Sequence, residues 1–204
     1  MIIGITGGTG CGKTTLLREI EKLGGVVLDC DAIYHGLLQT DREMLDAIGI
    51  RFPGTVTEKG LDRKKLGAIV FADEQALLDL NAITHGAVKK EVLRQLESRP
   101  ELAAIDAIGL FEGGLAELCH VTVAITAPAE MRVQRLMARD GISESYARNR
   151  IAAQHSEEWF REKCSHVLVN DETPEAFTGK CLAFLRQLGI IIEENIGRNE
   201  PSVE

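Results

Sequence analysis

Short apolar runs rich in β-branched residues alternate along this chain with longer segments in which apolar residues recur every three or four positions. The short runs predict strands at Met1–Thr6, Val26–Asp31, Ala103–Phe111, His120–Ala127 and Ser165–Asn170. Continuous apolar runs of this kind are typical of strands covered on both faces. The pattern predicts an α/β fold, a three-layer sandwich with a parallel sheet of about five strands and helices on both faces.

Capping and helix-breaking residues mark where the expected helices begin and end. Gly24-Gly25 ends a helix that begins at Lys13, and Pro100 stops a long amphipathic helix from Glu74. Ser143, Ser156 and Thr173 are expected N-caps. Further helices are predicted over 32–50, where the pattern is broken, from Asp62, and from Pro128 to Arg139.

The chain has 204 residues, a length that suits one domain. We expect a single domain over 1–192 and a disordered tail over 193–204. A polar, Arg-rich helical stretch over about 139–164 interrupts the alternation, as an inserted lid does.

Charge and cysteine content exclude several partners. The net charge is −8 and no run of Lys or Arg occurs, which argues against nucleic acid or an anionic membrane as a partner. No apolar run is long enough for a signal peptide or a membrane span, so we expect a cytoplasmic protein. The five cysteines show no CxxC spacing and predict reduced thiols, with neither disulfides nor a zinc site.

The stretch GITGGTGCGKTT contains the spacing GxxxxGK[ST] at Gly7, Gly12, Lys13 and Thr14, between a predicted strand and a predicted helix. Such a loop points its backbone N–H groups at phosphates, and the helix N-terminus adds positive charge. Lys13 is expected to reach the β- and γ-phosphates of ATP, and the Thr14 hydroxyl to bind Mg²⁺. The expected ATP contacts are Gly10, Cys11, Gly12, Lys13, Thr14 and Thr15. Cys11 is interpreted as a small loop residue and not as a nucleophile.

The loop alone does not separate a kinase from a switch protein. Asp106-Ala107-Ile108-Gly109 matches the DxxG of regulatory GTPases, yet no NKxD guanine-reading motif occurs. The lid-like stretch and the acids that end the second predicted strand favour phosphoryl transfer to a small molecule.

Several ordered blocks make the chain similar to the dephospho-CoA kinase family over about Met1 to Leu188. They are GITGGTGCGKTT, VLDCD, the distinctive GLDRKKLGAIVFADEQALLDLNAITH, LFEGGL, PAEMRVQRLMARDGIS, RIAAQ and VLVN. The resemblance implies transfer of the ATP γ-phosphate to the ribose 3′-hydroxyl of dephospho-CoA, the last step of coenzyme A synthesis. It also implies an acceptor-binding helical region over about 55–100 and a lid over about 139–164.

The resemblance also assigns roles to individual residues. Asp31 matches the proposed catalytic base, with Asp29 as its rival on the same strand face and N-capping by Asp31 as an alternative. Arg139 matches the arginine of an RDG turn that meets charge on the γ-phosphate. His85 and Glu112 are expected at the acceptor, Asp106 at Mg²⁺ through water, and Asn170 near the adenine. Arg135, Arg148 and Arg150 are interpreted as surface cations of the lid.

The chain departs from the family pattern at four places. His35 stands where the family usually has Arg, Gly86 where it has Pro, and Arg132 where it has Gln. Ile108-Gly109 replaces Pro-Leu before the Leu-Phe-Glu triplet. Two other functions therefore stay open: a kinase for another nucleoside or small alcohol, and a nucleotide-binding protein without turnover. The expected partners are ATP and dephospho-CoA, in a monomer or weak homo-oligomer.

Overall fold

The structure is a computed structural model that describes residues 1–58 and 60–191. In this part of the chain a five-stranded sheet has the order β2-β5-β1-β6-β7. Its strands are β1 (Ile2–Thr6), β2 (Val26–Asp29), β5 (Ala103–Asp106), β6 (Val121–Thr126) and β7 (His166–Val169). Both β1 and β2 pair in parallel with β5, so that Ile3 and Val27 each lie opposite Ala104. The predicted α/β fold with a five-stranded parallel sheet is confirmed.

The chain divides into two compact units, Met1–Thr6 with Gly24–Val123 and Gly7–Leu23 with Ala124–Glu204. The first is called the acid unit below, because it carries Asp29 and Asp31 at the junction of β2 and the next helix. The second is called the loop unit, because it carries the phosphate-binding loop. The expectation of a single domain over 1–192 stays a prediction. The expected tail, 193–204, lies outside the described residues.

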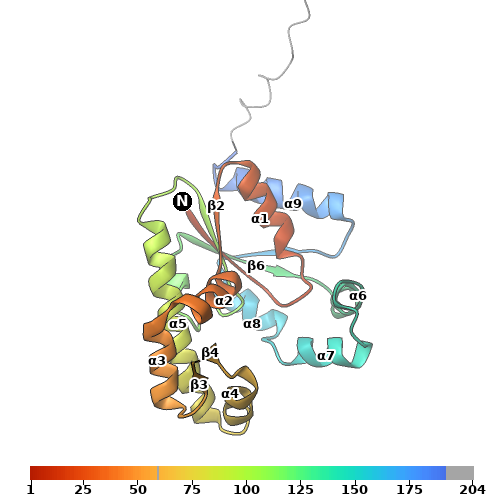
Figure 1. Ribbon diagram of the computed structural model, residues 1–204. Helices are drawn as coiled ribbons and strands as arrows, with labels where there is room; N and C mark the ends of the chain where they lie inside the picture. Colours follow the sequence, from red (N-terminus) through yellow and green to blue (C-terminus); the bar gives the residue numbers. More distant parts are fainter. Residues whose placement is uncertain (59, 192–204) are drawn as a thin grey trace, which may run out of the picture. The chain divides into compact units, whose positions relative to one another are not determined.

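In the acid unit, helices gather around one long helix, α5 (Glu74–Leu96). The others are α2 (Cys30–Thr40), α3 (Arg42–Arg51), α4 (Arg63–Val70) and the 3₁₀ turn η1 (Ala116–Leu118). Figure 1 shows α3, α4 and the small hairpin β3 (Val56–Thr57) with β4 (Gly60–Leu61) lying along α5. Ile48, Phe52 and Leu66 are buried in the core that these elements share. A second core joins Val88 and Val92 of α5 to Leu28 of β2 and Ile105 of β5.

The loop unit contains two pairs of packed helices. One pair is α1 (Lys13–Lys22) with α9 (Pro174–Gln187), and the other is α6 (Ala129–Asp140) with α7 (Glu144–Ala152). A short helix, α8 (Glu157–Lys163), precedes β7. The expected N-caps are confirmed, because the Ser143, Ser156 and Thr173 hydroxyls accept the N–H groups of Tyr146, Trp159 and Ala176. Val133 and Leu136 pack with Ala147 of α7.

Three sequence predictions of elements need correction. The second strand ends at Asp29 and not at Asp31, because the Asp29 carboxylate caps α2 by accepting the Ala32 N–H at 3.0 Å. The strand predicted over Ala103–Phe111 ends at Asp106, because the apolar residues after it form a buried turn. Leu110 lies in that turn with no exposed surface. No strand was predicted where the structure has the β3–β4 hairpin.

Candidate active site

The phosphate-binding loop, residues 7–14, has backbone angles that only glycine adopts readily. Gly7, Gly10 and Gly12 have φ values of 135°, 79° and 95°. A Cβ on Gly7 would also lie 2.2 Å from the Ile125 carbonyl oxygen. Gly12 is the N-cap of α1 and offers no side-chain acceptor to the first turn. The N-terminus of α1 is therefore free of a side-chain cap and suited to an anion.

Lys13 lies over its own loop. Its Nζ donates to the Gly7 carbonyl oxygen at 3.2 Å, so the ammonium group spans the loop from its last residues to its first. Thr14, next to it, is exposed, and the Thr15 N–H donates to the Gly12 carbonyl at 3.1 Å. This is the arrangement expected for a lysine that meets the outer phosphates and a threonine hydroxyl open to a metal ion.

Cys11 is buried, with 2% of its surface exposed. Burial raises the pKa of its thiol, against the opposing charges of Arg132 and Lys13. A thiol with a raised pKa is a poor nucleophile at neutral pH, which supports the interpretation of Cys11 as a small loop residue.

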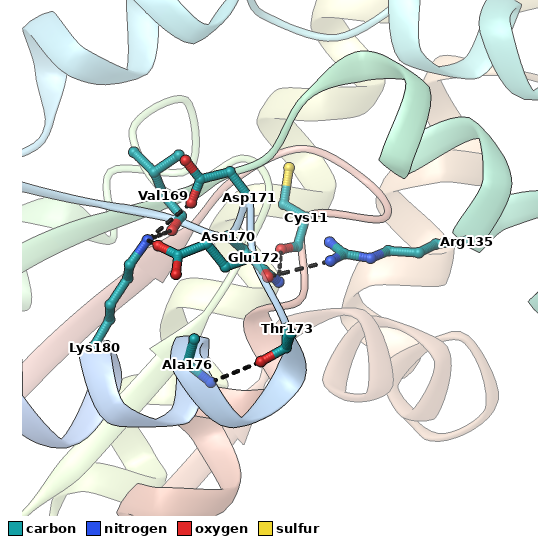
Figure 2. Close-up of polar contacts among 9 residues, drawn as sticks. All are labelled: Cys11, Arg135, Val169, Asn170, Asp171, Glu172, Thr173, Ala176 and Lys180. Atoms are coloured by element: carbon teal, nitrogen blue, oxygen red, sulfur yellow. Dashed lines mark hydrogen bonds and ion pairs between the residues drawn. The ribbon is translucent and has the colours of Figure 1, made fainter.

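Asn170 follows β7 and contacts the loop directly, as Figure 2 shows. Its Nδ2 donates to the Cys11 carbonyl at 2.9 Å, and its Oδ1 accepts from Arg135 Nη2 at 3.2 Å. A Cβ on Gly12 would lie 2.3 Å from Asn170 Nδ2. Asn170 therefore supports the loop backbone in this structure, while its expected contact with adenine stays a prediction.

A lysine of α9 holds the turn that carries Asn170 (Figure 2). Lys180 Nζ donates to the Val169 carbonyl at 3.1 Å and pairs with Asp171 at 2.8 Å and Glu172 at 2.7 Å. The Asp171 pKa is lowered, chiefly by the hydrogen bond from Lys180. The end of β7 is thus fixed on both sides of Asn170.

Arg135 was interpreted as a surface cation, and this was wrong. Its guanidinium is half-buried and also donates from Nη1 to the Gly10 carbonyl at 3.3 Å. Arg132, one helical turn earlier on α6, donates from Nε to the Thr9 carbonyl at 2.9 Å. The sequence signal was the spacing of these two arginines, since residues three apart share a helix face.

Gln154, which follows α7, was missed as a site residue. Its Oε1 accepts the Thr9 N–H and Arg132 Nη2, each at 2.9 Å. The only signal in the sequence was its place at the end of the block RIAAQ, and a lone glutamine has no distinctive chemistry.

Arg139 borders the loop but is engaged elsewhere. An open pocket of about 480 Å³ is lined by Gly10, Gly12, Thr14, Arg135, Leu136, Ala138 and Arg139. The Arg139 side chain is 61% exposed and donates to Asp140 from Nε at 2.7 Å and from Nη2 at 3.0 Å. Its expected role at the γ-phosphate therefore requires release from Asp140.

The other two lid arginines form ion pairs on the surface of the loop unit. Arg148 pairs with Glu130 and Glu144, both at 2.8 Å, and Arg150 pairs with Asp140 at 2.8 Å. Their interpretation as surface cations of the lid agrees with these contacts.

In the acid unit, the charges of three carboxylates help to raise the pKa of one buried thiol. The pKa of Cys30 is raised from 9.0 to about 12, first by burial and then by the charges of Asp106, Asp29 and Asp31. Asp31 lies in the first turn of α2 and is exposed, whereas Asp29 is the N-cap. The alternative that Asp31 caps the helix is wrong, and the two acids do not share a strand face.

His85 and Glu112 lie together, although they are far apart in sequence. A Cβ built on Gly109 would be 3.9 Å from His85 Nε2 and 3.8 Å from Glu112 Oε2. The turn that carries Gly109 is fixed where the Thr6 hydroxyl donates to the Ile108 carbonyl at 3.1 Å. The structure thus groups two of the residues expected at the acceptor.

Neither a metal cluster nor a membrane span is found over residues 1–58 and 60–191. No three His, Cys, Asp or Glu residues there form a group able to hold an ion. None of the helices in the same residues is long and apolar enough to cross a bilayer.

Comparison with known proteins gives the family. The sequence profile of the dephospho-CoA kinase family matches residues 1–175. The chain belongs to the dephospho-CoA kinase family. The dephospho-CoA kinase of Corynebacterium diphtheriae is 36% identical over 175 residues, 83% of this chain and 88% of that protein. That of Deinococcus radiodurans is 38% identical over 193 residues, 92% of each.

Solved structures agree with this assignment. TT1252 from Thermus thermophilus is 35% identical with a TM-score of 0.76, over 92% of this chain and 97% of that one. The dephospho-CoA kinase from Campylobacter jejuni is 25% identical with a TM-score of 0.64, over 92% of this chain and 96% of that chain. The predicted class, an ATP-dependent P-loop kinase that phosphorylates dephospho-CoA, is confirmed for the family, and the residue roles stay predictions.

Proposed function

We propose that this kinase holds ATP on the phosphate-binding loop and transfers its γ-phosphate to the ribose 3′-hydroxyl of dephospho-CoA. The observation that carries the proposal is the loop with its supports, in which Lys13, Asn170 and Arg135 all bond to loop carbonyls. No side chain caps the start of α1, and the positive end of the helix dipole there favours phosphate oxygens. A preorganised loop of this kind stabilises charge on the transferring phosphoryl group.

Asp31 is the proposed base. Its carboxylate is exposed and has no hydrogen-bond or ion-pair partner among the described residues, whereas Asp29 is engaged in capping α2. A carboxylate within hydrogen-bond reach of the ribose hydroxyl orients it and accepts its proton as the phosphate is transferred. The backbone carbonyl of Asp31 lies 2.7 Å from His35 Nδ1, which ties His35 to the same helical turn.

Mg²⁺ is the proposed cofactor, and the residues fit it. Mg²⁺ takes few protein ligands, keeps waters and substrate phosphates, and prefers oxygen ligands such as a hydroxyl and a carboxylate. The Thr14 hydroxyl would hold it directly, and the Asp106 carboxylate through water. When bound, the ion neutralises charge on the β- and γ-phosphates.

The acceptor is proposed to lie on the acid unit, where His85 and Glu112 meet. The same unit has an apolar pocket of about 240 Å³, lined by Tyr34, Leu38, Leu61, Arg63, Leu66, Gly67, Val70, Phe71 and Leu80. Arg63 is exposed and suits the pyrophosphate of dephospho-CoA, while the apolar walls suit its uncharged pantetheine arm. These residues lie in the expected acceptor-binding region, 55–100, and in α2.

The proposal is tested by the product. The purified kinase is incubated with ATP and Mg²⁺, with and without dephospho-CoA, and alongside a panel of nucleosides. Mass spectrometry should find one added phosphate at the ribose 3′ position only when dephospho-CoA is present. Phosphorylation of another nucleoside at a higher rate, or ATP binding without any phosphorylated product, contradicts the proposal.

A further inference from the structure

One side-chain oxygen that contacts the phosphate-binding loop has an unusual pair of donors. Gln154 Oε1 accepts both the Thr9 N–H and Arg132 Nη2 at 2.9 Å. Thr9 is a member of the loop and only 8% exposed. A backbone N–H of the loop together with a guanidinium is the donor set of a phosphate oxygen, but here it holds a neutral amide oxygen.

The Arg132 guanidinium lies directly against the loop backbone. A Cβ on Gly8 would be 2.2 Å from Arg132 Nη2 and 2.9 Å from Gln154 Oε1. Gly8 has no positive φ, so this position needs glycine for space and not for backbone conformation. The positive charge also reaches Cys11, whose pKa it lowers against the effect of burial. The hydrogen bonds of Arg132 and its close approach to Gly8 place this charge at the loop.

We propose that Gln154 Oε1 holds the place of an oxygen of the terminal phosphate, and that ATP displaces Gln154 to bind the Thr9 N–H and Arg132. This inference rests on the proposed ATP site on the loop. A phosphate oxygen is a charged acceptor and bonds to a guanidinium more strongly than a neutral amide does, so the exchange favours ATP. Arg132 is then a phosphate-binding residue, and Gln154 a gate contributed by the lid.

The terminal phosphate is favoured because of where Thr9 lies. The N-terminus of α1 attracts the β-phosphate, and Lys13 spans the β- and γ-phosphates. Thr9 lies four residues before Lys13 and outside the first turn of α1. We therefore assign the Thr9 N–H to the γ-phosphate, together with Arg132, which shares its acceptor. Because ADP lacks this phosphate, Arg132 should strengthen the binding of ATP more than that of ADP.

The test measures binding of a non-hydrolysable ATP analogue and of ADP by calorimetry, without dephospho-CoA. Arg132→Met should weaken the ATP analogue about 10- to 100-fold, the size of a lost charge-assisted hydrogen bond, with ADP affinity changed by less than about threefold. Gln154→Leu removes the competing oxygen and should leave ATP binding equal or tighter. Arg148→Met is the matched control, because it removes a lid arginine that pairs with Glu130 and Glu144.

Equal losses for both nucleotides in Arg132→Met would show that Arg132 only braces the loop, and would overturn the inference. Weaker ATP binding in Gln154→Leu would contradict the proposal that ATP displaces the Gln154 side chain. Circular dichroism checks folding, and Arg132→Lys, which keeps the charge with fewer donors, should retain part of the preference for ATP. If Arg132→Met does not fold, Arg132→Lys replaces it: a reduced preference for ATP over ADP supports the inference, and an unchanged preference overturns it. Because dephospho-CoA is absent, failure of acceptor phosphorylation leaves these binding results interpretable.

Discussion

Asp29 and Asp31 are separated by one residue, yet the structure gives them different tasks. The Asp29 carboxylate accepts the Ala32 N–H at 3.0 Å and begins α2. Asp31 lies inside the helix with its carboxylate exposed. The difference arises because the chain leaves the extended conformation between them, at Cys30.

We expect Asp31→Asn to lower turnover about 10²- to 10⁴-fold, the usual contribution of a general base. ATP affinity should change only a few-fold, because Asp31 is not part of the loop. Asp29→Asn is the matched control, since asparagine also caps helices, and Asp29→Ala should cost about 1 kcal/mol of stability. Steady-state kinetics and urea unfolding measure the two effects. A larger loss of turnover in Asp29→Asn would move the role of base to Asp29.

Lys13→Ala should leave the fold intact, because this side chain lies on the loop and not in a hydrophobic core. Turnover should be almost abolished and ATP binding weakened, since the β- and γ-phosphates lose their cation. ATP at 100 times the wild-type Kd stabilises the wild type by about 2.7 kcal/mol, and the same concentration should raise the melting temperature of the variant much less. Lys22→Ala, at the far end of α1, removes a lysine paired with Glu19 and should behave as wild type. Normal turnover in Lys13→Ala contradicts the loop assignment.

At the scale of elements, the expected lid joins the loop through polar contacts. Surface ion pairs connect α6 with α7, and Gln154 and Arg132 connect the end of α7 with Thr9. Exposed ion pairs contribute little to stability individually and are screened by salt. Such contacts are weak enough to be exchanged when substrates bind.

We expect amide hydrogen exchange over 139–164 to be fast in the free kinase and slower with a bisubstrate analogue of ATP and dephospho-CoA, because lids close to exclude water. Closure should also release Arg139 from Asp140. Asp140→Asn removes the carboxylate charge that holds Arg139, and it should raise or preserve turnover if Arg139 is recruited to the γ-phosphate. Equal protection of these amides with and without the analogue would show that the segment is a fixed structural element. Arg139 would then have no closing movement to bring it to the γ-phosphate.

At the scale of the whole molecule, all five cysteines are free thiols. Burial raises the pKa of Cys119 to about 11 and that of Cys181 to about 12, and Cys30 also reaches about 12. Cys164 is buried as well. Thiols with pKa values of about 11 to 12 are protonated at neutral pH, and burial shields Cys30, Cys164 and Cys181 from reagents.

We expect iodoacetamide at pH 8 to modify the native kinase slowly and the urea-unfolded chain at all five positions, as mass spectrometry would show. Because the native pKa values are raised, stability from these thiols is full below their ordinary pKa of 9.0 and is lost as pH rises toward 12. Cys30→Ala should flatten the fall in unfolding free energy over that range. Rapid native labelling of Cys11 at pH 8 would contradict the assignment of an inert loop thiol.

The sequence by itself determined the class of fold, the phosphate-binding loop and the helix caps at Ser143, Ser156 and Thr173, because each depends on residues close together in the chain. Apolar runs are typical of buried strands whatever lies beside them, and GxxxxGKT specifies its own backbone geometry. The blocks shared with the dephospho-CoA kinase family added the acceptor, and they led to the proposed role of Asp31 as base.

Only the tertiary structure decided which distant side chains meet. Arg135 was interpreted in the same way as the exposed Arg148, and the contacts of Arg135 and Arg132 with Gly10 and Thr9 depend on how α6 packs beside the loop. The place of Gln154 at the end of the block RIAAQ did not indicate its role, because that role depends on two donors that lie 145 and 22 residues away. The apolar run after Asp106 was predicted to be a strand because a run of apolar residues indicates burial. Apolar residues in a turn can be buried as well, so the run does not distinguish a strand from a turn. Local chemistry can be read from neighbouring residues, but a contact between distant ones requires the packed chain.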